Sequence, residues 1–131
     1  MAVEMNDVIR WFHLLAATVW VGGMITVAAI VPALRSNGVS RKQLQAMARR
    51  FGAVSWLAMA VAITTGIAQI FRLDVELTGA LATKLILVGA AVMLAFAHRE
   101  IARNAGPAWR GVMEGALLMV GLGILAAAVA L

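Results

Sequence analysis

The sequence predicts an all-α integral membrane protein built as a transmembrane bundle of four helices. Of its 131 residues, 63% are hydrophobic and only 13% are charged, whereas soluble domains are about half apolar and about a quarter charged. A membrane-spanning helix needs about 20 apolar residues, and the sequence has four such stretches separated by short polar links. These stretches use most of the length, so a single domain over residues 1–131 is expected.

The four spanning helices are expected at about residues 8–31, 53–71, 80–97 and 109–131. Pro32 should end or kink the first helix, because proline has no backbone N–H to donate. The link that follows contains a turn pattern and a capping box, Asn37-Gly38 and Ser40-Arg-Lys-Gln43. Residues 41–51 have apolar side chains on one face and basic ones on the other, which predicts an amphipathic segment at the membrane surface.

Lysine and arginine are distributed unevenly between the two sides of this bundle. The links after the first and third helices contain eight of them: Arg35, Arg41, Lys42, Arg49, Arg50, Arg99, Arg103 and Arg110. The opposite side has three: Arg10, Arg72 and Lys84. Links rich in lysine and arginine stay in the cytoplasm, so both termini are expected to be periplasmic.

The net charge of +5 is therefore interpreted as topology, and no nucleic-acid partner is expected. The first residues are acidic where a signal peptide would be basic, so the first helix is expected to remain in the protein. The sequence has no cysteine, which excludes disulfides and thiolate ligands. It also has no P-loop, zinc motif or nucleophilic triad, so an enzymatic role is not favoured.

His13 is the leading candidate for a functional residue. It is one of two histidines and lies near the start of the first apolar stretch. An ionisable side chain inside a spanning helix is costly, and it usually faces the bundle interior and has a functional role. The alternative is that His13 lies at headgroup level, with Trp11 as an aromatic anchor.

Five further polar residues are expected near the depth of His13: Thr65, Gln69 and Arg72 on the second helix and Thr83 and Lys84 on the third. The helix faces that carry them are otherwise rich in alanine, and small residues let helices approach closely. The sequence therefore predicts a cationic, hydrogen-bonding pocket open to the periplasmic side. The alternative is that Arg72 and Lys84 extend to lipid phosphates.

Two cofactor chemistries fit a histidine at this position. Haem b can be bound by two histidines, but His13 and His98 are expected at opposite membrane surfaces, about 27 Å apart in helix rise. A haem on His13 alone is compatible with the sequence, with Arg72 or Lys84 at its propionates. His98 is expected to serve a structural role at the other surface, where Glu114 should pair with a neighbouring arginine.

Copper is the other candidate, because Cu(I) prefers thioether and imidazole ligands. The chain has eight methionines, but none lies three or four residues from another within a spanning helix. Most are therefore expected to be packing residues. His13 is the candidate metal ligand.

The residues that carry a family resemblance are, in order, His13, Trp20-Val-Gly-Gly23, Pro32, Arg49-Arg50-Phe51, Thr65-Gly66, Lys84-Leu85, His98-Arg99 and Glu114. In these positions, over nearly the whole chain, the sequence resembles the CopD copper-resistance domain. The resemblance implies a multi-pass protein of the bacterial inner membrane that takes part in moving copper across it. His98 stands where the family pattern has asparagine.

A more distant resemblance is to HemJ-type protoporphyrinogen oxidases, which are small haem proteins with a similar histidine and lysine. Ala82 stands where those proteins have another histidine. The favoured function is thus copper handling, the second a haem-b redox protein linked to a porphyrin or quinone, and the third an accessory membrane subunit. Four short helices enclose little volume, so self-association is expected. The transport direction and the redox partner stay open.

Overall fold

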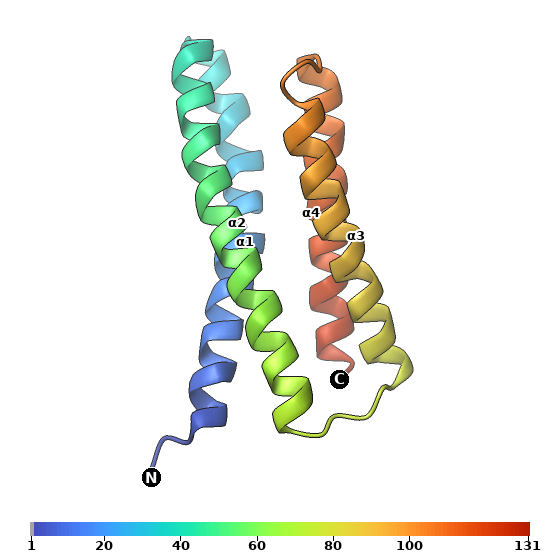
Figure 1. Cartoon of the computed structure of the whole chain (residues 1–131). Helices are drawn as coiled ribbons and strands as arrows, with labels where there is room; N and C mark the ends of the chain where they lie inside the picture. Colours follow the sequence, from blue (N-terminus) through green and yellow to red (C-terminus); the bar gives the residue numbers. More distant parts are fainter. Residues whose placement is uncertain (1) are drawn as a thin grey trace. The chain divides into compact units, whose positions relative to one another are not determined.

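The computed structural model describes residues 2–131, and the regular secondary structure of this part is four α-helices. These are α1 (Met5–Ser36), α2 (Arg41–Arg72), α3 (Gly79–Ile101) and α4 (Pro107–Val129). α1 packs along α2, and α3 packs along α4. The chain thus forms two antiparallel helical hairpins, one ending at Val75 and the other starting at Glu76 (Figure 1).

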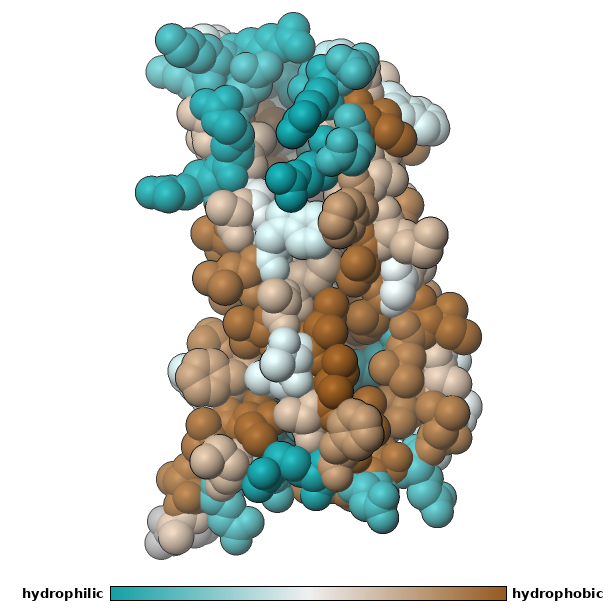
Figure 2. Space-filling view, viewed as in Figure 1, coloured by the Kyte–Doolittle hydropathy of each residue, from teal (hydrophilic) through white to brown (hydrophobic). Residues whose placement is uncertain are grey.

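All four helices are long and apolar enough to cross a membrane. Hydrophilic side chains gather at the helix ends, and hydrophobic ones cover the middle parts (Figure 2). α1 and α2 have 32 residues each, or about 48 Å of helix, and the bilayer core is about 30 Å thick. The prediction of an all-α, multi-pass membrane protein is therefore confirmed at the level of its four helices.

The first hairpin differs from the sequence-based expectation at its connecting end. α1 continues through Pro32 to Ser36, so this proline costs one helical hydrogen bond without ending the helix. Residues 41–51 are not a separate segment, because they form the first turns of the unbroken helix α2. Phe51, on their apolar face, lies against Gly23 of α1. One residue of the amphipathic face thus contacts α1, and the location of residues 41–51 at the membrane surface stays a prediction.

The turn between α1 and α2 has the predicted chemistry. Gly38 has φ +80°, a left-handed conformation that glycine adopts without a steric penalty. The Ser40 hydroxyl accepts from the Gln43 N–H, and the Gln43 side chain accepts from the Ser40 N–H at 3.1 Å. This reciprocal pair is the expected capping box, and it satisfies N–H groups that have no partner within the helix.

In the second hairpin, the starts of both helices and one close contact between them also depend on particular residues. The Thr78 hydroxyl accepts from the Leu81 N–H at 3.3 Å and caps α3. α4 starts at Pro107, a position where a missing N–H costs nothing. Gly123 of α4 lets Leu87 of α3 approach closely, since a Cβ there would be 3.3 Å from the Leu87 side chain. Each hairpin therefore has its own glycine-dependent contact between helices.

Gly23→Ala tests the close contact in the first hairpin. A Cβ on Gly23 would be 2.7 Å from Cε2 of Phe51, whereas a Cβ on the adjacent Gly22 would meet nothing within 4 Å. Overpacking of this kind costs about 1–3 kcal/mol. We expect Gly23→Ala to lower the thermal unfolding temperature in detergent relative to Gly22→Ala, which carries the same change in helix propensity. Equal unfolding temperatures would contradict the packing described.

Candidate functional site

The imidazole of His13 joins α1 to α2 by hydrogen bonds. Its Nδ1 lies 2.9 Å from the carbonyl oxygen of Ala62 and 3.1 Å from the hydroxyl of Thr65. That hydroxyl also lies 2.6 Å from the carbonyl oxygen of Val61, to which it donates. The ring is part-buried. An ionisable side chain in the apolar stretch is thus held in place by groups of the neighbouring helix.

The carbonyl of Ala62 determines which ring nitrogen of His13 carries the proton. A carbonyl oxygen can only accept, so Nδ1 must be the donor. In the neutral imidazole, Nε2 is then the nitrogen that carries the lone pair. Metal-binding histidines have this arrangement, in which one ring N–H donates to a carbonyl and fixes the orientation of the ligating nitrogen.

Gly66 makes this contact sterically feasible. A Cβ at this position would lie 3.2 Å from Cε1 and 3.6 Å from Nδ1 of His13. In a helix, the side chain of residue 66 would also lie over the turn that contains the carbonyl of Ala62. A glycine here leaves that carbonyl accessible and lets the imidazole approach α2.

Two of the other predicted site residues also belong to the first hairpin. The Gln69 side chain donates from Nε2 to the carbonyl of Thr65 at 3.3 Å, one turn back along α2. It therefore lies on the part of α2 that His13 contacts. Arg72 donates from Nε to Oδ1 of Asn6 at 2.8 Å. This bond joins the last turn of α2 to the first turn of α1. The sequence had suggested that Arg72 lies in the pocket or extends to lipid phosphates, and neither interpretation included Asn6 as its partner.

Lys84 lies on α3, in the second hairpin, and is half-buried. Its participation in a pocket with His13 and Gln69 stays a prediction. In the same hairpin, Nε2 of His98 lies 3.8 Å from Oε1 of Glu114, a distance that suits an ion pair but not a hydrogen bond. Nδ1 of His98 is buried without a hydrogen-bond partner among the described residues. The expected arginine partner of Glu114 is thus replaced by a histidine.

The side chains available as metal ligands in the described part of the chain are few. In residues 2–131, no group of three or more His, Asp or Glu side chains could hold a metal ion. The first hairpin contributes one oriented imidazole, backed by a carbonyl and a hydroxyl. Three residues of this site were not assigned a role by the sequence reasoning: Ala62, Gly66 and Asn6. Gly66 could have been identified from the sequence, since Thr65-Gly66 is part of the family resemblance. The carbonyl of Ala62 could not, because every residue has a backbone carbonyl.

In comparisons with known proteins, no family model, curated protein or solved structure matches this chain.

The contact between Gly66 and His13 can be tested by a double-mutant cycle. Gly66→Ala should be less stable by about 1 kcal/mol than a Gly→Ala change at an open position of the same helix, because the new methyl group crowds the ring. In the His13→Ala background that cost should disappear, since the clashing ring is absent. Gly52→Ala is the matched control on the same helix, because a Cβ there meets nothing within 4 Å. Thermal unfolding of the four variants measures the coupling, and additive effects would contradict the geometry.

Proposed function

We propose that this protein handles copper in the bacterial inner membrane, with Nε2 of His13 as a ligand for the transported ion. The observation that supports this proposal is the hydrogen bond from His13 Nδ1 to the carbonyl of Ala62. It selects the tautomer in which Nε2 can bind a metal, and it fixes the ring orientation. The resemblance of the residues around His13 to the CopD domain favours copper as the ion.

The chemistry of the site suits a transported ion better than a resident one. Cu(I) accepts imidazole and thioether ligands at low coordination number. A single imidazole, whose Nδ1–H is shared between the Ala62 carbonyl and the Thr65 hydroxyl, leaves the remaining coordination positions of the ion to mobile ligands. Thr65 donates its proton to Val61 and can therefore accept from His13. His13 keeps its orientation in both the loaded and the empty state, because its supports are on α2 and not on the ion.

Haem b is the second candidate, because an imidazole that donates from Nδ1 to a carbonyl would be equally suited to bind a haem iron through Nε2. In that case His13 would hold the iron. The bound haem would supply the one-electron redox chemistry. Arg72 is less suited to a propionate, since its Nε already donates to Asn6.

Three alanine variants distinguish these functions. His13→Ala should abolish copper retention, measured by elemental analysis of the purified protein after loading with Cu(I), while the protein still folds. His98→Ala is the matched control, because its side chain contacts Glu114 in the second hairpin, and it should retain copper. Lys84→Ala should also retain copper, because removing a cation does not weaken the binding of another cation.

Other outcomes have definite meanings. A Soret band in the absorption spectrum of the wild-type protein that is lost in His13→Ala would identify the ligand of His13 as haem and not copper. Equal copper retention in wild type and all three variants would contradict both ligand proposals and leave an accessory role.

We also propose that both termini are periplasmic and that the α1–α2 turn is cytoplasmic. The support is the distribution of eight basic residues on one side and three on the other. The long first hairpin is compatible with this topology, because its basic end includes Arg35, Arg41 and Lys42 beside a tight turn. Removing this hydrophilic end from water would be costly.

Reporter fusions test the topology. A fusion at Asn37, in the α1–α2 turn, should report the cytoplasm, and a fusion at Asp74, after α2, should report the periplasm. Removal of three positive charges by Arg35→Gln, Arg41→Gln and Lys42→Gln should weaken this preference, because the bias depends on lysine and arginine near the ends of the spans. A cytoplasmic reporter at Asp74 in the unmodified chain would overturn the assignment.

A further inference from the structure

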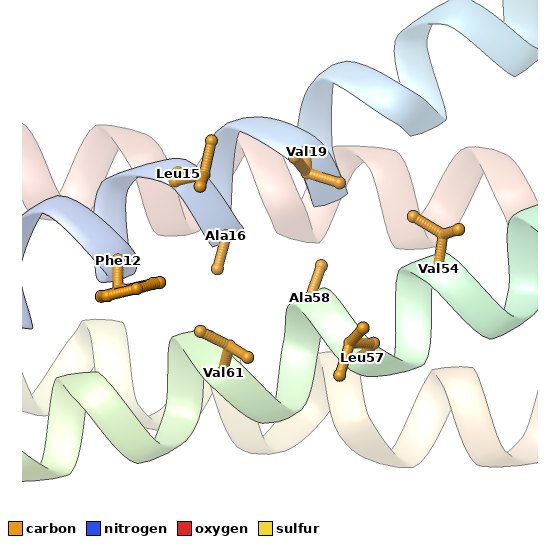
Figure 3. A pocket seen from close by; sticks show the side chains of 8 residues that line it. All are labelled: Phe12, Leu15, Ala16, Val19, Val54, Leu57, Ala58 and Val61. Atoms are coloured by element: carbon orange, nitrogen blue, oxygen red, sulfur yellow. The ribbon is translucent and has the colours of Figure 1, made fainter.

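A second feature of the first hairpin is a groove on its surface, lined only by apolar side chains. Its volume is about 240 Å³. The lining residues are Phe12, Leu15, Ala16 and Val19 of α1 and Val54, Leu57, Ala58 and Val61 of α2 (Figure 3). Ala16 and Ala58 point toward one another and form the floor, while Phe12 and Leu57 are 45% and 67% exposed and form walls. The groove is therefore shallow, open and suited to a narrow apolar chain.

The groove lies within the part of both helices that has no Lys, Arg, Asp or Glu, which is the part that a bilayer core would surround. α1 has no charged residue between Arg10 and Arg35, and α2 has none between Arg50 and Arg72. Val54, the lining residue closest to the basic end, is four residues from Arg50, or about 6 Å in helix rise. A ligand that fills the groove toward Val61 would therefore begin close to the boundary of the bilayer core.

Arg50 supplies a positive charge at this boundary. Arg50, Val54, Leu57 and Val61 have the spacing i, i+4, i+7 and i+11, which places them along one stripe of α2. The Arg50 side chain is exposed. α2 contains no acidic residue, and the acids of α1 and its cap are at the opposite end of the hairpin. The charge at the end of the groove is therefore not neutralised by acids nearby in the first hairpin.

We propose that the groove is a binding site for an anionic phospholipid of the leaflet on the basic side, with one acyl chain between α1 and α2 and the phosphate on Arg50. The guanidinium forms charge-assisted, bidentate hydrogen bonds with phosphate oxygens. The acyl chain fills the space between the alanine floor and the walls formed by Phe12 and Leu57. This site does not involve His13 and is independent of the copper proposal.

Charge favours this lipid over a second copy of the chain. Most homodimers have a two-fold axis, which brings the same surface of both subunits together. In a membrane, with that axis along the bilayer normal, the two Arg50 side chains would meet at the same depth. Such like-charge contacts are unfavourable. An anionic headgroup in the same place neutralises the charge.

Native mass spectrometry of the full-length protein in detergent tests this site. The probes are dioleoyl phosphatidylglycerol and dioleoyl phosphatidylcholine, which have the same acyl chains and differ in net charge. We expect wild type to bind phosphatidylglycerol more tightly. Arg50→Gln should weaken phosphatidylglycerol binding about fivefold, the effect of one arginine near an anionic lipid surface, and should remove the preference. Val54→Phe, at a rim position that is 45% exposed, should weaken binding of both lipids by filling the groove.

Two matched controls make the result specific. Arg41→Gln removes the same charge nine residues away, about 14 Å along α2, and should leave binding unchanged. Ala60→Phe adds the same ring at an exposed position outside the groove and should also have no effect. Equal losses in Arg41→Gln and Arg50→Gln would overturn the site, and so would a dimer that Val54→Phe dissociates, because the groove would then be an interface between copies.

Discussion

The hydrogen bond from the His13 ring to the carbonyl of Ala62 is the constraint on which the candidate site of the first hairpin depends. Inside a bilayer no water is available to satisfy a polar side chain, so an imidazole must find its partner within the protein. The partner here is the backbone of α2, and it is accessible because residue 66 is glycine. The bond orients the ring, selects its tautomer and holds α1 close to α2. The proposed metal site follows from this one contact.

The same close approach of α1 and α2 explains the rest of the hairpin. Phe51 fits over Gly23 toward the turn, and Arg72 bonds to Asn6 at the other end. Between them, Ala16 and Ala58 face one another and leave the apolar groove (Figure 3). Helices in lipid gain little from hydrophobic burial, so small residues and polar contacts must supply their association. The hairpin therefore has a polar side chain contact near one end, a steric contact near the other and an open surface between them.

The sequence was sufficient for the number of helices, because a long apolar stretch is a local feature of the chain. Four apolar stretches predicted four spans. The capping box at Ser40 and Gln43 was also predicted, but the second helix was expected to start only near residue 53, whereas α2 starts directly after this cap. The sequence did not show that residues 41–51 are continuous with α2, because an amphipathic pattern is the same in a separate segment and in the first turns of a longer helix. It also could not identify the partner of His13, since every residue has a backbone carbonyl and only the fold selects Ala62. The shared pocket with Lys84 stays a prediction, as does self-association, because both depend on contacts beyond the first hairpin.

The central claim concerns one proton, and nitrogen NMR of the protein labelled with ¹⁵N-histidine in lipid measures its position directly. The chemical shifts of the two ring nitrogens distinguish a protonated nitrogen from one that carries a lone pair. His13 is expected to show a protonated Nδ1 and an unprotonated Nε2 near neutral pH, and the His13→Ala spectrum assigns the signals. A neutral His13 with the proton on Nε2 would contradict the bond to Ala62, and with it the orientation proposed for the metal ligand.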